Sequence, residues 1–170
     1  EVKALTYAYK MGLTVCWDAG HWPAYDLAGK NIADLGGGPV SILLKCLNRG
    51  PRCMVVDPCP YPDWVAARYE HAGIGYSRTK AEEFAGDGYD EAWLYNVLQH
   101  VDDPEKIVTN ARRAAPVVRI FEWVGIPACD GHPHELRAAL LDQWRGGTGA
   151  VEVLNENFCV GAAYYGVFAH

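Results

Sequence analysis

The residues with the clearest chemical pattern in this sequence are two aspartates separated by a run of glycines. Asp34 ends a short apolar segment, glycines 36–38 follow it, and Asp57 ends a second apolar segment 19 residues after Gly38. Glycines allow a backbone to approach a ligand closely and to adopt positive φ. An acid at the end of the second strand of a βαβ unit can accept hydrogen bonds from both hydroxyls of a ribose. Each feature alone fits an ordinary turn or strand end, but together they predict a nucleoside site.

A parallel sheet would bring these residues together, and the surrounding segments alternate between strand and helix patterns. From Val40, apolar residues at i, i+3, i+4 and i+7 predict a helix that ends near Gly50, and its first N–H groups would attract an anion. The run Asp103-Pro104-Glu105 is typical of a helix start. Strands are predicted over 31–35, 53–56, 74–77, 91–95 and 117–124, and further helices over 63–71, 103–115 and 133–144.

In the last part of the chain, two more strands are predicted over 150–154 and 160–169, and the short loop between them indicates an antiparallel hairpin. Repeated strand–helix–strand units indicate a parallel sheet with helices on both faces. The predicted fold class is therefore α/β, with a Rossmann-like, doubly wound, mostly parallel seven-stranded sheet and an antiparallel C-terminal strand.

The first 30 residues precede this core, and we expect them to belong to the same single domain of residues 1–170. We predict that these residues form a helix and a loop, and that the loop is a lid over the carboxyl ends of the strands. In such a lid, Asp18 and His21 would face a second substrate. The alternative is a segment that only covers one face of the sheet. The segment is rich in aromatic residues: Tyr7, Tyr9, Trp17, Trp22 and Tyr25.

Two ligand classes share the layout of a glycine loop followed by an acid. Nicotinamide dinucleotide sites use G-x-G-x-x-G, but here Ser41 stands at the third glycine position and Pro39 interrupts the turn. The alternative pattern, D-x-G-x-G, fits residues 34–38. "IADLGGGPV", "MVVDP", "KAEEF" and "YDEAWLYNVLQHVDDPEKIV" resemble, in this order, the motifs of class I S-adenosylmethionine-dependent methyltransferases. The resemblance covers residues 31–113, and the final hairpin is similar to that family's reversed last strand.

The resemblance implies a role for each matched position. Asp34 and glycines 36–38 would hold the methionine end of S-adenosylmethionine, and Asp57 would bind the ribose. Lys80 stands where the family commonly has an acid, so a side-chain contact to the adenine amino group is not expected from it. The implied cofactor-binding residues are Asp34, Gly36, Gly37, Gly38, Asp57, Pro58, Ala81, Glu82 and Asn96.

Methyl transfer mainly requires alignment of the nucleophile with the sulfonium methyl group and exclusion of water, and some acceptors also need a general base. The predicted strand ends on the ligand side offer Glu122, His100 and His132 as catalytic residues, with His134 next to them. Ordinary structural roles are the alternative: a hydrogen-bonded acid for Glu122, and a helix cap for the 132–134 histidines. Nothing in their spacing demands a metal, and none is predicted.

Composition narrows the acceptor and the setting. The net charge of −6 argues against a nucleic-acid partner, so a small-molecule acceptor is expected. The six cysteines form no C-x-x-C pair, which fits a reducing cytoplasm, and no apolar run approaches the ~20 residues of a membrane span. A nicotinamide-dependent oxidoreductase, or a cofactor-binding module without its own catalysis, remain as alternative functions. The oligomeric state is not predicted.

Overall fold

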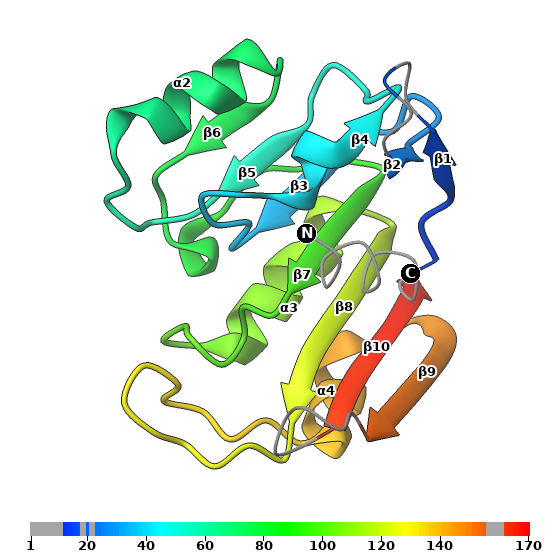
Figure 1. The fold of residues 1–170 in the computed structure, drawn as a ribbon. Coiled ribbons are helices and arrows are strands. Elements are labelled where there is room, and N and C mark those ends of the chain that lie inside the picture. Colours follow the sequence, from blue (N-terminus) through cyan, green and yellow to red (C-terminus); the bar gives the residue numbers. More distant parts are fainter. Residues whose placement is uncertain (1–11, 18–19, 21–22, 156–161) are drawn as a thin grey trace.

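The computed structural model describes residues 12–17, 20, 23–155 and 162–170. Its main element is a seven-stranded sheet with the order β6-β5-β3-β7-β8-β10-β9 (Figure 1). β10 runs antiparallel to both of its neighbours, and the pairs from β6 to β8 are all parallel. This confirms the predicted fold class. The strands are β3 (Ile32–Leu35), β5 (Met54–Val56), β6 (Gly75–Ser77), β7 (Glu91–Tyr95), β8 (Val117–Val124), β9 (Thr148–Asn155) and β10 (Ala162–Ala169).

The strand order reverses at β3. After β3 the chain builds outward through β5 and β6, and it then returns to the other side of β3 to form β7 and β8. Leu35, at the end of β3, pairs with Val56 on one side and with Leu94 on the other. The loops after β3, β5 and β7 therefore leave the sheet together, and in an open α/β sheet a ligand crevice forms at such a point.

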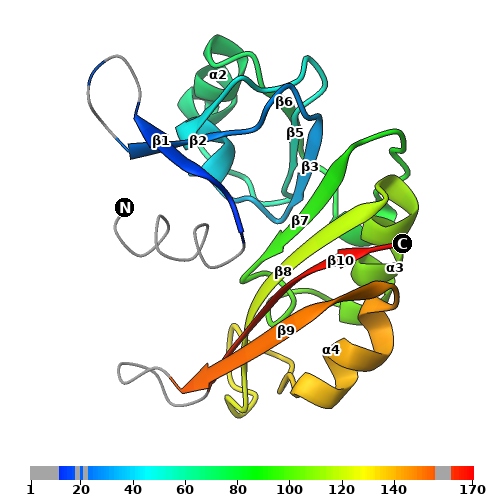
Figure 2. The ribbon, with the colours of Figure 1, turned by 90° about the vertical axis from the view of Figure 1, so that its right-hand side faces the viewer.

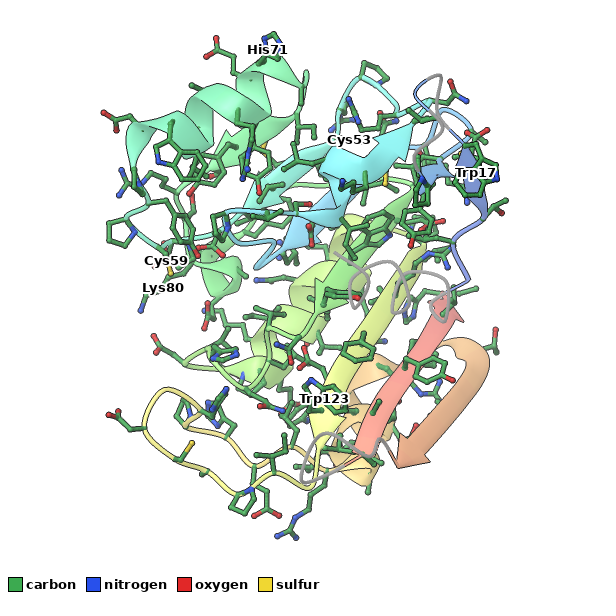
Figure 3. The ribbon with its side chains drawn as sticks, viewed as in Figure 1. Trp17, Cys53, Cys59, His71, Lys80 and Trp123 are labelled. Carbon is green, nitrogen blue, oxygen red and sulfur yellow. The ribbon has the colours of Figure 1, made fainter. Side chains whose placement is uncertain are left out.

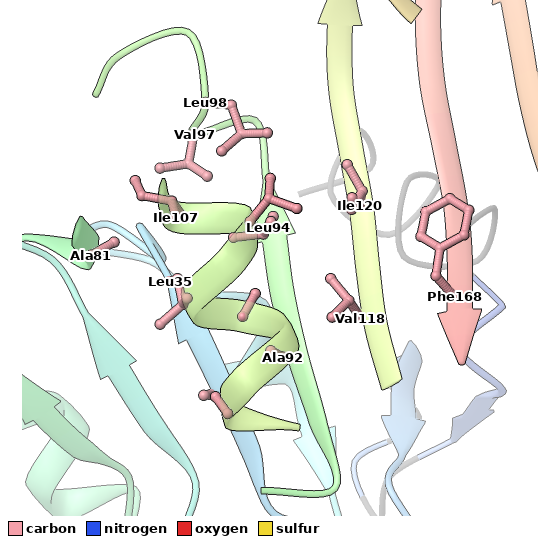
Figure 4. Close-up of a cluster of buried hydrophobic side chains, with 14 of the residues drawn as sticks. Leu35, Ala81, Ala92, Leu94, Val97, Leu98, Ile107, Val118, Ile120 and Phe168 are labelled. Atoms are coloured by element: carbon pink, nitrogen blue, oxygen red, sulfur yellow. The ribbon is translucent and has the colours of Figure 1, made fainter. Parts of the chain in front are cut away.

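Helices cover both faces of the sheet (Figure 2). α2 (Asp63–His71) packs Val65 and Tyr69 onto one face, whereas α3 (Pro104–Ala114) and α4 (Ala138–Arg145) pack onto the other. In the core under α3, Ile107 lies beside Leu94 (Figure 4). The predicted start of α3 is confirmed, because the Asp103 side chain accepts a hydrogen bond from the N–H of Lys106 at 3.0 Å.

The predicted helix from Val40 to Gly50 is wrong. The segment instead forms a short 3₁₀ helix, η1 (Ile42–Lys45), and strand β4 (Cys46–Leu47). Strand pairing overrides the helical spacing, since Cys46 pairs in parallel with Tyr25. Arg49 stabilises this path because its guanidinium donates hydrogen bonds to the carbonyl groups of Leu43 and Cys46.

α4 also differs from the prediction, because it begins at Ala138 rather than at residue 133. The residues before it are bound to neighbouring loops. The carbonyl of Leu136 accepts a hydrogen bond from Gly125 N–H at 2.9 Å, and His134 Nε2 lies 2.7 Å from the carbonyl oxygen of Val101. These contacts hold the segment in an irregular path.

The described part of the N-terminal segment is a β-hairpin. β1 (Val15–Trp17) and β2 (Pro23–Asp26) are antiparallel, and β4 joins them as a third strand. Figure 1 shows this small sheet away from the arrowheads of β3, β7 and β8. Tyr25 is fully buried in the same core cluster as Val55 and Trp93. This described part therefore covers one sheet face, which was the alternative to a lid. The expected lid residues Tyr7, Tyr9, Asp18, His21 and Trp22 lie outside the described residues.

A buried ionic network joins this segment to the sheet. At the start of β7, the Glu91 carboxylate accepts hydrogen bonds from Lys30 Nζ at 2.7 Å and from Trp93 Nε1 at 3.0 Å. It also accepts two from the Arg119 guanidinium, at 2.5 and 3.0 Å. Burial alone would raise the pKa of Glu91, but the hydrogen bonds and charge of Arg119 outweigh it and lower the pKa to about 2.

We expect Glu91→Leu to lower the free energy of unfolding by about 3–5 kcal/mol, because it removes the carboxylate that faces the buried Arg119 guanidinium. The exposed Glu105→Leu is the matched control and should change stability by less than about 1 kcal/mol. Urea unfolding at pH 7 measures both variants, and equal stability of the two would contradict this role of the network.

Candidate cofactor site

A pocket of about 140 Å³ opens where the loops after β3, β5, β6 and β7 meet. The pocket unites residues that the sequence places far apart, and it includes five of the nine predicted cofactor-binding residues. These five are Gly36, Asp57, Pro58, Ala81 and Glu82. Asp34, Gly37, Gly38 and Asn96 are not among the residues that line it.

The glycine loop packs so tightly that two of its positions exclude any side chain. Gly36 has a φ of +79°, and a Cβ added there would lie 2.1 Å from Cγ2 of Val97. A Cβ added to Gly37 would lie 2.4 Å from Oδ2 of Asp34. The glycines are therefore required by the approach of the neighbouring loop and of the buried acid, in addition to any ligand.

Asp34 lies beneath this loop rather than in the pocket. Its side chain is buried, and Oδ2 accepts a hydrogen bond from the Ser41 hydroxyl at 2.5 Å. Oδ1 has no hydrogen-bond partner among the described residues. Burial raises the pKa of Asp34 to about 6, against the opposing effect of the Ser41 hydrogen bond. The geometry supports a role in holding the loop.

The donors that follow the loop are already used within the protein. Ser41 Oγ accepts a hydrogen bond from Leu43 N–H at 3.0 Å, and the N–H of Ser41 donates to the Tyr69 hydroxyl at 2.9 Å. The Tyr69 hydroxyl in turn donates to the carbonyl of Gly38 at 2.7 Å. The anion site predicted at a helix start is therefore not formed. Tyr69 was not predicted from the sequence, because nothing in helix α2 signals that this residue reaches the loop.

Asp57 connects the glycine loop to the wall of the pocket. Oδ2 accepts a hydrogen bond from Gly38 N–H and Oδ1 accepts one from Cys59 N–H, both at 3.0 Å. A carboxylate has about four acceptor positions, so the two oxygens retain capacity for hydroxyl groups in the pocket. This arrangement fits the predicted contact with a ribose.

The opposite wall is formed by η2 (Ala81–Glu83). Asn110 Nδ2 donates to the carbonyls of Ala81 and Glu82 and fixes this turn on α3. Glu82 Oε1 accepts hydrogen bonds from the N–H groups of Asp102 and Asp103 at 2.9 and 3.3 Å. The Glu82 carboxylate thus joins two loops of the pocket.

An ion pair spans the rim next to this wall. Lys80 Nζ lies 2.5 Å from Oδ2 of Asp102, and both residues line the pocket together with Cys59. Figure 3 shows Lys80 and Cys59 next to one another at this edge. Because both side chains of the pair are largely exposed, it contributes little to stability, and its effect is to fill the rim.

The three residues predicted for catalysis and the neighbouring His134 lie at different depths. His100 lines the pocket, and its ring centroid is 4.4 Å from that of His132. His132 Nδ1 is 3.4 Å from Cys129 Sγ. Glu122 is fully buried, and its Oε1 accepts hydrogen bonds from loop N–H groups. Neither Glu122, His132 nor His134 is among the lining residues, so the structure brings only His100 to the pocket.

Among residues 12–17, 20, 23–155 and 162–170, no group of three or more His, Cys, Asp or Glu side chains has an arrangement that could hold a metal ion. Within the same ranges, no helix has both the length and the apolar character needed to cross a membrane.

The buried Glu122 carboxyl gives a pH-dependent stability that can be measured. Burial raises its pKa to about 8, despite the two hydrogen bonds from backbone N–H groups. The folded protein therefore binds this proton more tightly than the unfolded chain. The stabilisation is fully present below the ordinary glutamate pKa of about 4.5 and is lost as the pH rises through about 8.

We expect the stability of the wild type to fall relative to Glu122→Gln between pH 5 and pH 8, by about 1.4 kcal/mol per pH unit where the linkage is complete. The glutamine variant cannot lose this proton. Denaturant unfolding of both proteins across this range gives the difference directly. A difference that does not change with pH would show that Glu122 titrates normally.

Comparison with known proteins identifies the fold and the domain. Residues 33–116 match the model of the "Methyltransferase domain" family. No curated protein matches the sequence. Among solved structures, N-methyltransferase NodS from Bradyrhizobium japonicum in complex with S-adenosyl-L-homocysteine has a TM-score of 0.70 and 13% identity, and the match covers 100% of this chain and 87% of that chain.

Two further structures share this fold. The 1,6-didemethyltoxoflavin-N1-methyltransferase of Burkholderia thailandensis, with bound S-adenosylhomocysteine, has a TM-score of 0.66 at 13% identity over 98% of this chain and 76% of that chain. Magnesium protoporphyrin IX methyltransferase of Synechocystis, with bound S-adenosylmethionine, has a TM-score of 0.60 at 13% identity over 83% and 71%. Residues 33–116 are thus similar to a methyltransferase domain, and the fold of the chain is shared with structures named as methyltransferases that hold S-adenosylmethionine or S-adenosylhomocysteine.

Proposed function

We propose that the protein transfers the methyl group of S-adenosylmethionine to a small-molecule acceptor. The observation that carries this proposal is the pocket shared by Gly36, Asp57 and Ala81 at the point where the strand order reverses. These residues belong to three separate motifs of the sequence. A pocket that unites them is what a nucleoside joined to an amino acid requires, because the acid binds the ribose while the glycine loop leaves room for the other end.

In this proposal each wall of the pocket binds one part of the cofactor. Asp57 accepts the ribose hydroxyls, and Pro58 and Ala81 enclose the adenine. The loop of Gly36 borders the methionine part, and Asn96 follows β7 on the same side. Asp34 and Glu82 act one step further away, through the hydrogen bonds that hold the loops.

The small-molecule acceptor is supported by the names of similar structures and by charge. Two of the structures similar in fold are named as methyltransferases of 1,6-didemethyltoxoflavin and of magnesium protoporphyrin IX. The net charge of −6 disfavours a polyanionic nucleic-acid acceptor. His100, at the pocket, is the residue we propose as general base for acceptors that must lose a proton, with the tilted ring of His132 next to it.

We also propose that the protein acts in the cytoplasm and that residues 1–170 work as one domain. The described cysteines, Cys16, Cys46, Cys53, Cys59 and Cys129, are all free thiols. Free thiols persist in a reducing compartment.

Cofactor binding tests the proposal directly. We expect S-adenosylmethionine and S-adenosylhomocysteine to bind with micromolar Kd, and NAD to bind at least about 100-fold more weakly, a difference of about 2.7 kcal/mol. The glycine loop, interrupted by Pro39, does not provide the third glycine of a dinucleotide site. Isothermal titration calorimetry measures all three ligands. Binding of NAD as tight as that of S-adenosylhomocysteine would favour an oxidoreductase instead.

Mutation of Asp57 tests the proposed contact with the ribose most directly. Asp57→Ala should weaken S-adenosylhomocysteine binding by about tenfold to 100-fold, because hydrogen bonds to a charged group contribute about 1.5–3 kcal/mol. Asp57 also accepts hydrogen bonds from Gly38 and Cys59, so Asp57→Asn serves as the matched variant. It keeps one oxygen for the protein and loses the charge.

The two variants separate the direct contact from the structural one. We expect Asp57→Asn to retain most of the wild-type thermal stability and still bind S-adenosylhomocysteine more weakly than the wild type. Wild-type affinity in a folded Asp57→Ala protein would show that this acid does not bind the ribose.

A further inference from the structure

The geometry points to Glu122 as a positioning residue for methyl transfer, one that holds the loop 96–99 in place without touching either substrate. This inference rests on the proposed function, because the loop matters for catalysis only if the pocket binds S-adenosylmethionine. Glu122 was predicted from the sequence as a candidate general base. Its surroundings support a different role, which depends on where its hydrogen bonds go.

The carboxyl of Glu122 accepts hydrogen bonds from two backbone N–H groups of the loop. Oε1 accepts hydrogen bonds from the N–H of Val97 at 2.8 Å and from the N–H of Leu98 at 2.9 Å. The Glu122 side chain and Leu98 are fully buried, and Val97 is nearly so. Without this oxygen, two buried N–H groups would lose their acceptor, and water could not easily replace it.

The residues on either side of Glu122 extend the same interaction. The carbonyl of Phe121 accepts a hydrogen bond from Asn96 N–H at 2.7 Å, and the carbonyl of Trp123 accepts one from Gln99 Nε2 at 2.5 Å. Three consecutive residues at the end of β8 therefore bind four consecutive residues of the loop. Glu122 is the only one of the three that does so through its side chain, so it is the one that a substitution can remove.

The loop needs such support because its backbone is unfavourable at its first residue. Asn96 has a φ of +55°, in the left-handed region that residues with a side chain seldom occupy. Residues 96–99 belong to none of the helices or strands, so no regular hydrogen-bond pattern holds this conformation. Strained backbone of this kind persists only where the surrounding structure fixes it, and it is common at functional sites.

The same loop forms part of the pocket. Val97 and His100 line it, and Val97 packs against Gly36 so closely that a Cβ on that glycine would lie 2.1 Å away. A shift of the loop would therefore displace one wall of the pocket and release the glycine loop on the other side. Figure 4 shows Val97 and Leu98 above Leu94 at the end of β7, where the loop leaves the sheet.

Glu122 itself stays away from the pocket. It is fully buried, it is not among the lining residues, and its second oxygen, Oε2, has no hydrogen-bond partner in the described part of the chain. A general base must come within hydrogen-bond distance of the proton that it removes. The buried position satisfies the requirements of an internal acceptor for the loop instead, and a neutral side chain with the same oxygen should serve equally well.

Three variants test this inference. Glu122→Gln keeps an oxygen that can accept from both N–H groups, whereas Glu122→Leu removes it and keeps a similar volume. Ile120→Ala, two residues earlier on the same face of β8 and also fully buried, destabilises the core without removing a hydrogen bond from the loop. The measurements are amide hydrogen exchange by NMR on the ligand-free proteins and S-adenosylhomocysteine binding by calorimetry.

In Glu122→Leu we expect the Val97 and Leu98 amides to exchange at least about tenfold faster than in the wild type. We also expect the affinity for S-adenosylhomocysteine to fall at least about tenfold. Each tenfold change corresponds to about 1.4 kcal/mol. Glu122→Gln should stay within about threefold of the wild type in both measurements. Ile120→Ala should lose thermal stability but keep wild-type exchange at these two amides and wild-type affinity.

Three results would overturn the inference. The first is wild-type exchange and affinity in folded Glu122→Leu, and the second is an equal loss of affinity in Ile120→Ala, which would reduce the effect to general stability. The third is a glutamine variant as impaired as the leucine variant, which would mean that the ionisable carboxyl is needed. The exchange measurement needs no cofactor. It therefore tests whether Glu122 holds the loop in place even if the wild type fails to bind S-adenosylhomocysteine and the proposed function is wrong.

Discussion

The close approach of the glycine loop to the loop after β7 is the constraint on which the rest of the site depends. Gly36 leaves no room for a side chain because Val97 occupies that space, and Val97 is in turn fixed by a hydrogen bond to Glu122 near the end of β8. One contact therefore connects β3, β7 and β8 at their carboxyl ends. The adjacent β5 joins the same unit through Asp57, which binds the N–H of Gly38. The shape of the pocket follows from these internal contacts.

Three buried acids show how differently the same functional group can be used in one sheet. Glu91 faces Arg119 and Lys30 and stays ionised, whereas Asp34 and Glu122 have hydroxyl or N–H partners and no cation, and burial raises the pKa of both. Glu91 lies at the amino ends of the strands, and the other two acids lie at the carboxyl ends, beneath the loops. Because its pKa is about 8, Glu122 can fix a loop at neutral pH without placing a full negative charge behind the pocket.

Much of the fold could be predicted from the sequence because local signals and tertiary packing agree. Strands β7 and β8 and helices α2 and α3 have clear apolar patterns and end signals, and the structure confirms them. The helix prediction for the segment after the glycines was wrong for a physical reason. The apolar residues have helical spacing, but strand pairing of Cys46 with Tyr25, 21 residues earlier, determines the structure of the segment. A local sequence pattern does not indicate a pairing partner at that distance.

The site was predictable in its outline and less so in its roles. The motifs located five lining residues, because loops at a reversal of strand order must meet. They could not reveal that the carboxylates of Asp34 and Glu82 point to protein donors rather than to a ligand. They also gave no sign of Tyr69, whose hydroxyl supports Gly38 from a helix 31 residues away. Side-chain direction depends on packing, and a single sequence does not contain that information in a readable form.

The replacement of the expected helix by η1 and β4 changes where this domain can be divided. β4 belongs to the small sheet through β2, and only seven residues separate Gly38 from its first residue, Cys46. The glycine loop is therefore joined to the N-terminal hairpin by a short, fully ordered connection. A fragment that begins at β3 would contain every motif of the family and yet would lack the strand on which β4 is built. The smallest unit that can be excised with its pocket intact thus starts ahead of the first motif, and recombination or truncation at the motif boundary would cut through a sheet.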